Sequence, residues 1–133
     1  MSTLAQVMRK KLKVVPHTAS IKEAASRMRD ERVSALFVEK GGSFVGIVTD
    51  TDLVRRGVAE GVDIGKTAVE TIMTSPIVTI DGIRTVQDAH DMMGDLSVRH
   101  LGVTERGQIT GVVSVRDLLV YFKSVSEPKI AQD

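Results

Sequence analysis

Two short segments place a hydroxyl side chain three residues before a carboxylate, at the end of an apolar run. In GIVTDTD the pair is Thr49 and Asp52, and in GVVSVRD it is Ser114 and Asp117. This spacing is typical of a capping box, in which both side chains bond backbone N–H groups at a helix start. The same groups could instead bind a nucleotide. A helix N-terminus and a hydroxyl bind phosphate, and a carboxylate accepts hydrogen bonds from two ribose hydroxyls. The spacing favours capping and leaves nucleotide binding open.

Both segments belong to a longer internal repeat. Shifted by 65 residues, residues 8–54 align with residues 73–119 without a gap, and 12 of the 47 pairs are identical. Gly46 and Gly111 form one of these pairs and would let another backbone come close to their strand. A repeat of two copies predicts two similar units about a pseudo-two-fold axis. Each copy is too small to bury enough surface alone, so we expect a shared interface.

Each copy predicts the order strand, helix, strand, strand, helix. In the first copy we expect strands at residues 12–15, 35–38 and 44–48, a helix that follows the cap Ser20, and a helix at residues 52–59. In the second copy we expect strands at residues 77–80, 100–103 and 109–113, a helix from the cap Thr85 to Gly94, and a helix at residues 117–123. Residues 63–74 are expected to form a linker with one helical turn, and the polar tail from residue 126 to be frayed.

The composition and the net charge argue against several classes of function. The 133 residues carry a net charge of +1, so bulk electrostatics gives no case for nucleic-acid binding. The cluster Arg9, Lys10, Lys11 and Lys13 is expected to be a solvated surface rather than a phosphate-binding patch. There is no cysteine, which excludes disulfides and thiolate metal sites and is compatible with the cytoplasm. No secretory signal and no apolar run long enough for a membrane span are evident.

The three histidines lack metal-ligand spacing, and no catalytic dyad is evident, so we expect no metal site and no enzyme activity. His17 and His90 are expected at the surface or on helices. Arg55 and Arg56 are expected to be solvated. His100 could be a hydrogen-bonded core residue or a ligand contact.

The duplicated unit resembles a tandem pair of CBS (cystathionine beta-synthase) domains, a stand-alone Bateman module. The family motif is Gly, two apolar residues, Ser or Thr, two variable residues and Asp, and both copies carry it in full. The segments RVSALFV and VRHLGV also resemble the family's second strand. The resemblance implies an α+β fold in which two β-α-β-β-α repeats pack sheet to sheet about a pseudo-two-fold axis. We expect the boundaries to be 7–61 for the first domain, 72–124 for the second, 62–71 for the linker and 125–133 for the tail.

The resemblance implies two clefts that bind AMP, ADP, ATP or, less expected, S-adenosylmethionine. In the family, the Asp holds the ribose, the Ser or Thr contacts phosphate or ribose, and adenine lies against the other copy. By position, this assigns to one cleft Ser114, Arg116 and Asp117 with Thr18, Val33, Ser34 and Ala35. It assigns to the other cleft Thr49, Thr51 and Asp52 with Ile83, Val98, Arg99, His100 and Leu101.

The two clefts are expected to bind with unequal affinity. Arg116 supplies a cation beside Asp117, whereas its counterpart is Thr51 and the neighbouring Asp50 opposes phosphate. Arg99 and His100 could compensate. We therefore expect the Asp117 site to be the better one.

The predicted function is a regulatory module that senses adenosine nucleotides and signals by changed packing or partner binding. The effector would be an unknown separate protein or the module's own homodimer. The alternatives are a structural or interaction homodimer whose motifs serve only as caps, and a nucleic-acid binder acting through residues 9–13.

Overall fold

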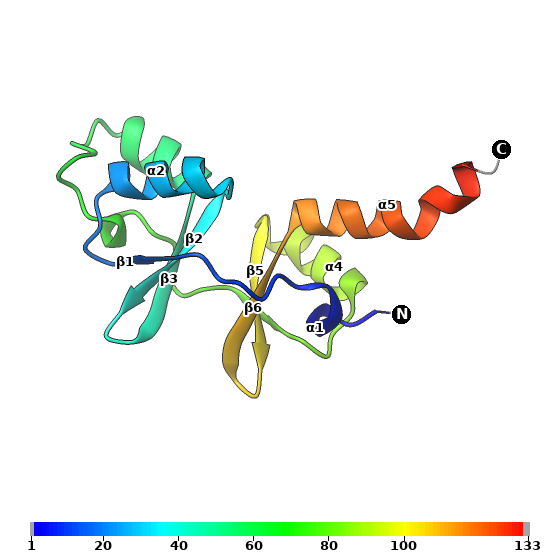
Figure 1. Ribbon diagram of the computed structural model, residues 1–133. Helices are drawn as coiled ribbons and strands as arrows, with labels where there is room; N and C mark the ends of the chain where they lie inside the picture. The colour runs from blue at the N-terminus through cyan, green and yellow to red at the C-terminus, as the bar shows by residue number, and fades with distance from the viewer. Residues whose placement is uncertain (1, 132–133) are drawn as a thin grey trace. The chain divides into compact units, whose positions relative to one another are not determined.

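The computed structural model describes the backbone of residues 2–131 and the side chains of residues 2–126. The chain divides into two compact units, each with its own strands and helices (Figure 1). The first unit is residues 12–77, and the second unit is residues 78–133 together with residues 1–11. Each unit contains one copy of the repeat, so the two-copy organisation predicted from the sequence is confirmed.

The first unit has the predicted order of strand, helix, strand, strand, helix. Its elements are β1 (Val14–Pro16), α2 (Ile21–Glu31), β2 (Ala35–Lys40), β3 (Ser43–Thr49), α3 (Asp50–Asp52), η1 (Leu53–Val58) and η2 (Val69–Thr71). The sheet order is β1-β2-β3, with β1 parallel and β3 antiparallel to β2. The turn between β2 and β3 places Gly41 and Gly42 at positive φ, which glycine adopts without strain. Helix η1 is a π-helix, and η2 is the single helical turn expected in the linker.

The second unit repeats this arrangement. Its elements are α1 (Leu4–Val7), β4 (Thr79–Asp81), α4 (Val86–Leu96), β5 (His100–Glu105), β6 (Gln108–Ser114) and α5 (Val115–Ala131). The sheet order is β4-β5-β6 with the same strand directions. The register is also the same, because Ala35 pairs with Thr49 in the first unit and His100 pairs with Ser114 in the second. The first strand of each unit begins two residues later than the sequence predicts.

The caps at Ser20 and Thr85 are confirmed as helix starts, since each hydroxyl accepts the N–H of the residue three positions later. The predicted helix end at Gly94 is wrong. Helix α4 continues to Leu96 and is capped by Ser97 at φ 54°, at the same repeat position where Arg32 (φ 55°) caps α2. The N–H of the following residue also bonds back to the last turn in both units, which satisfies the free carbonyl without a glycine.

The tail, which the sequence predicted to be frayed, is helical within the described residues. Helix α5 runs to Ala131, and residues 132–133 lie outside the described part of the chain. The hydroxyls of Ser124 and Ser126 donate to the carbonyls of Tyr121 and Phe122 on the same helix. Because the helix itself supplies partners for these serines, their polarity is compatible with helix and does not indicate a loop.

Each unit has its own hydrophobic core, and each core includes a segment from outside the repeat's strands and main helices. We call residues 4–9 and 69–74 the flanking segments; the first belongs to the second unit, and the other to the first unit. Leu4 and Val69 occupy the same repeat position, and both are fully buried in their cores. The flanking segments thus complete the two cores.

The flanking segments also extend the edges of the two sheets. Arg9 exchanges two backbone hydrogen bonds of 3.0 Å with Val112 on β6, and Thr74 exchanges two of 2.8 and 3.0 Å with Ile47 on β3. Gly46 permits this approach, because a Cβ there would lie 2.9 Å from the Thr74 carbonyl oxygen. The expectation that Gly46 and Gly111 admit another backbone is therefore confirmed.

Candidate functional site

The hydroxyl and carboxylate of each motif form a capping box at the start of the last helix of the unit. In the first unit, Thr49 N–H donates to Asp52 Oδ2 at 3.0 Å, and Asp52 N–H donates to Thr49 Oγ1 at 3.2 Å. In the second unit, Ser114 N–H donates to Asp117 Oδ2 at 2.9 Å, and Asp117 N–H donates to Ser114 Oγ at 3.2 Å. Capping is therefore confirmed in both copies. The cap uses only Oδ2 of each carboxylate, so Oδ1 takes no part in it.

Each unit brings the start of its second strand beside its own motif. Ala35 pairs with Thr49, and Asp50 N–H donates to the Ser34 carbonyl at 2.9 Å. In the second unit His100 pairs with Ser114, and the N–H of the residue after Ser114 donates to the Arg99 carbonyl at 2.9 Å. These contacts group the predicted site residues within one repeat. The crossed grouping that the family resemblance implies stays a prediction.

Two of the predicted residues lie at the other end of their own sheet. Thr18 follows β1 and Ile83 follows β4, and both first strands run parallel to their neighbours. Because Thr49 and Ser114 pair with the opposite ends of those neighbours, Thr18 and Ile83 are separated from their own repeat's motif. Both residues are exposed.

The remaining predicted residues differ in accessibility. Leu101 is fully buried in the core of the second unit, so its side chain cannot line an open site. Val33 and Val98 are half-buried against the two cores. Arg99 and Arg116 are exposed, and His100 and Thr51 are half-buried. The accessible predicted residues beside each motif are therefore mainly polar.

Asp52 is the one buried charged residue among the described residues, at 8% exposure. Its Oδ2 closes the cap and also receives a long hydrogen bond, 3.5 Å, from Thr74 Oγ1 of the flanking segment. Its Oδ1 has Arg56 Nε at 3.9 Å, which is an ion-pair distance and too long for a hydrogen bond. No side-chain oxygen or nitrogen of the described residues is both fully buried and unbonded, so Oδ1 reaches solvent. This oxygen can accept further hydrogen bonds.

Asp117 has a different environment. Its Oδ1 accepts Arg9 Nε at 2.9 Å and lies 2.8 Å from the second guanidinium nitrogen, Nη2. Its Oδ2 accepts the backbone N–H of Ser114 and, at 3.0 Å, the Ser114 hydroxyl. Arg9 is not among the residues that the sequence predicted beside the motif. It occupies the repeat position of Thr74, but the alignment alone does not show that either residue contacts the motif.

The basic residues that were expected to be solvated are exposed, except the half-buried Lys13, and several of them also have partners within the chain. Arg56 is not simply solvated, because its Nη1 donates to the carbonyls of Ile72 and Met73 at 3.2 Å. The cluster at residues 9–13 is exposed at Arg9, Lys10 and Lys11, as expected, but two of its charges are paired. Arg9 pairs with Asp117, and Lys13 lies 3.1 Å from Glu31, where it and Arg27 lower the pKa of the Glu31 carboxyl. Two of the cluster's four charges are thus neutralised within the chain.

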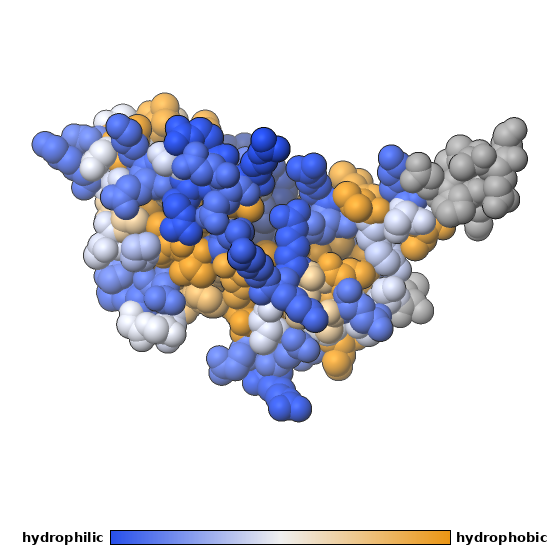
Figure 2. All heavy atoms as spheres, viewed as in Figure 1, coloured by the Kyte–Doolittle hydropathy of each residue, from blue (hydrophilic) through white to orange (hydrophobic). Residues whose placement is uncertain are grey.

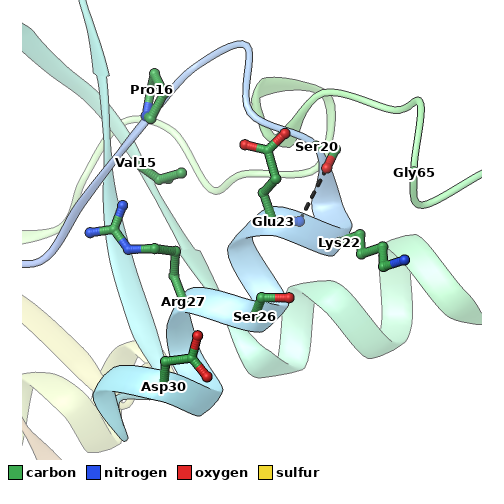
Figure 3. A pocket seen from close by; sticks show the side chains of 9 residues that line it. All are labelled: Val15, Pro16, Ser20, Lys22, Glu23, Ser26, Arg27, Asp30 and Gly65. Atoms are coloured by element: carbon green, nitrogen blue, oxygen red, sulfur yellow. Dashed lines mark hydrogen bonds between the residues drawn. The ribbon is translucent and has the colours of Figure 1, made fainter.

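A hollow of about 490 Å³ lies on the first unit, away from the motif (Figure 3). Figure 3 shows that its lining side chains come from β1 and from one face of α2, together with the backbone near Gly65. It contains none of the residues predicted to bind a ligand, and its lining mixes both signs of charge, with Lys22 and Arg27 near Glu23 and Asp30. The motif therefore remains the stronger candidate site.

The described residues contain no group of three or more His, Asp or Glu side chains placed to hold a metal ion. No helix among them combines the length and apolarity that crossing a membrane requires.

The two units define a tandem module in which each α+β repeat ends its sheet on the same capped motif. Comparison with known proteins names this class. The CBS domain family matches the chain twice, over residues 4–59 and residues 69–124, and the chain belongs to that family. Tandem CBS domains form a module that is generally regulatory and ligand-binding.

Relatives and solved structures agree with this family. The chain is 31% identical over 120 residues to the CBS domain-containing protein YhcV of Bacillus subtilis, covering 90% of this chain and 85% of that protein. A putative signal-transduction protein with CBS domains from Burkholderia ambifaria has a TM-score of 0.86 and 28% identity, over 93% of both chains. A hexameric CBS-CP12 protein from bloom-forming cyanobacteria has a TM-score of 0.83 and 25% identity, over 95% of this chain and 75% of that one.

Proposed function

We propose that this protein is a regulatory module that binds adenosine nucleotides, AMP, ADP or ATP, at its Ser/Thr-x-x-Asp motifs. The observation that carries the proposal is the arrangement of the two oxygens of Asp52. Oδ2 closes the helix cap, and Oδ1 reaches solvent. A capping box needs only one of these oxygens, so Oδ1 of Asp52 can accept a hydroxyl of a ligand.

The chemistry of the surroundings suits a nucleoside phosphate. The Asp52 carboxylate can accept ribose hydroxyls, which are hydrogen-bond donors. The Thr49 hydroxyl and the nearby peptide groups of Ser34 and Ala35 add polar partners at the same end of the sheet. S-adenosylmethionine carries the same ribose without phosphates and is the competing ligand. Because AMP, ADP and ATP report the energy state of the cell, their binding here would make the module an energy sensor.

The module would signal by a change in packing that a partner or a second copy detects. A ligand can shift such an equilibrium only by its difference in affinity for the two states. We further propose that the module is a homodimer. Large apolar side chains are exposed on the last helix of both units, including Val54, Val58, Leu119 and Val120. Figure 2 shows hydrophobic side chains at the surface along the described part of α5.

Calorimetric titration with AMP, ADP, ATP and S-adenosylmethionine tests the proposal. We expect micromolar binding of one adenosine nucleotide, lost in Asp52→Asn or in the double variant Asp52→Asn, Asp117→Asn. Asparagine can still accept the capping hydrogen bond through its amide oxygen, but its NH₂ group cannot accept a ribose hydroxyl.

Asp88→Asn is the matched control. Asp88 closes the Thr85 capping box just as Asp52 closes the Thr49 box, and hydrogen bonds from Arg84 and Thr85 lower the pKa of the Asp88 carboxyl. This variant should bind nucleotide normally. If protein shown to be folded and free of co-purified ligand gives no heat with any of the four compounds, the motifs are caps only.

A further inference from the structure

The two motifs differ in one contact that the repeat symmetry does not predict. The flanking segment of the second unit carries Arg9 at the position where the flanking segment of the first unit carries Thr74. Both residues make the same pair of backbone hydrogen bonds to the edge strand, and both direct their side chains at the aspartate of the motif. Arg9 places a guanidinium beside its carboxylate, whereas Thr74 places a hydroxyl there. The same backbone arrangement therefore gives the two carboxylates different partners.

Together, Arg9 and Ser114 occupy the hydrogen-bond acceptor positions of the Asp117 carboxylate. An ionised carboxylate has about four lone-pair positions. At Asp117, Oδ1 faces two guanidinium nitrogens at 2.9 and 2.8 Å, and Oδ2 accepts two groups of Ser114 at 2.9 and 3.0 Å. Two ribose hydroxyls could bind there only by displacing Arg9 or opening the cap.

The backbone of Arg9 is fixed, which keeps its guanidinium beside Asp117. Arg9 is fixed to β6 by two hydrogen bonds with Val112, and the preceding Met8 is 8% exposed and lies against Gly111. The side chain of Arg9 is 49% exposed and that of Asp117 is 17% exposed. A ligand would therefore have to break a short, charge-assisted contact at a partly buried carboxylate.

Within the described residues of its own unit, Asp52 has no contact equivalent to that of Arg9 with Asp117. Thr74 reaches Oδ2 at 3.5 Å and leaves Oδ1 alone, and Arg56 lies 3.9 Å from Oδ1. Arg56 is held by the carbonyls of Ile72 and Met73. A positive group near a free acceptor oxygen would also favour the phosphate of an incoming nucleotide.

We infer that Arg9 closes the motif of the second unit and that the module therefore binds its ligand through Asp52 in the first unit. This inference rests on the proposed function and adds which repeat is used and what excludes the other. It reverses the expectation from the sequence, in which Arg116 made the Asp117 site the better one.

The test combines Arg9→Ala with the two motif variants in calorimetric titrations of the full chain. Wild-type protein should bind one equivalent of nucleotide, lost in Asp52→Asn and kept in Asp117→Asn. Arg9→Ala should bind a second equivalent, with affinity for the second unit raised at least about tenfold, and Asp117→Asn in that background should remove it. Lys10→Ala, which deletes the same charge one residue away, should leave the stoichiometry at one.

Placing an arginine at the equivalent position of the first unit gives a second test. Thr74→Arg places a guanidinium at the equivalent position of the first unit and should abolish wild-type binding, whereas Thr74→Val should keep it. Nucleotide binding by wild-type protein that depends on Asp117 would overturn the inference and leave the proposed function standing. Weaker binding in Arg9→Ala would show that Arg9 holds the ligand, and would also overturn it.

The contact itself can be measured without nucleotide, which separates the inference from the proposed function. In a nuclear magnetic resonance spectrum, the Arg9 Nε–H should exchange slowly with solvent in wild-type protein and quickly in Asp117→Asn. If no nucleotide binds to any variant while Arg9 Nε–H is protected, the proposed function fails. The contact of Arg9 with the Asp117 carboxylate is then still supported. Unprotected Nε–H in wild-type protein overturns the closure.

Discussion

At the scale of single residues, the two motif aspartates are equivalent in the repeat but differ in their contacts. Asp52 and Asp117 are identical in type, position and capping geometry, and each accepts the N–H of the first motif residue. They differ in how the flanking segment reaches them: Thr74, 22 positions away, lies 3.5 Å from the capping oxygen Oδ2 of Asp52. Arg9, 108 positions away, donates to the other oxygen, Oδ1, of Asp117. Capping was predictable because it is local in sequence; the partner of Oδ1 was not, because it is set by tertiary contact.

The glycine of each motif has a specific steric role that can be tested. A Cβ at Gly111 would lie 2.7 Å from Met8 Cγ and 3.0 Å from the Arg9 carbonyl oxygen. Gly111→Ala should therefore push the flanking segment off β6 and destabilise the protein by about 1–3 kcal/mol, the usual cost of overpacking. Urea unfolding followed by circular dichroism measures the change.

Gly94→Ala is the matched control for this substitution. Gly94 lies inside α4, and a Cβ there would meet no atom within 4 Å. The substitution should stabilise the helix by about 0.5–1 kcal/mol, because alanine loses less conformational freedom than glycine. Equal effects of the two alanines would contradict the proposed role of Gly111.

At the scale of elements, the flanking segments are the feature that the sequence described least well. The expected domain began at residue 7 and treated residues 62–71 as a linker, whereas α1 and η2 each place a fully buried side chain in a core. A four-residue helix and a single 3-10 turn have too little periodicity to be recognised in the sequence. The repeat alignment from residue 8 to residue 54 stops just short of them.

Leu4→Ala tests whether α1 belongs to the core of the second unit. Leu4 is 0% exposed, and its truncation should cost about 2–5 kcal/mol of unfolding free energy through lost burial and a residual cavity. Native-state hydrogen exchange should show the loss in β5 and β6. Leu119→Ala, at a side chain that is 64% exposed, should change stability by about 0.5 kcal/mol or less. Similar effects of the two substitutions would remove α1 from the core.

At the scale of the whole molecule, the chain has two cores and exposed apolar side chains on helices of both units. Sedimentation velocity should find a homodimer, with twice the chain mass of 14.4 kDa. Leu119→Glu should shift this species toward the monomer, because it puts a charge on an exposed apolar helix position. Ile83→Glu, at a 79% exposed side chain in a loop, should leave the mass unchanged. A monomeric wild-type protein would refute the proposed homodimer.

The sequence by itself determined the two-copy organisation, the order of elements, the capped motifs and, through them, the family. These features are local or periodic, and each of them occurs in both copies of the repeat. Only the tertiary structure decided that Gly94 lies inside a helix, that Arg56 is bound to backbone carbonyls, and that Arg9 lies on Asp117. Those outcomes depend on which distant segments share a core and a sheet edge. A spacing rule along the chain carries no information about such contacts.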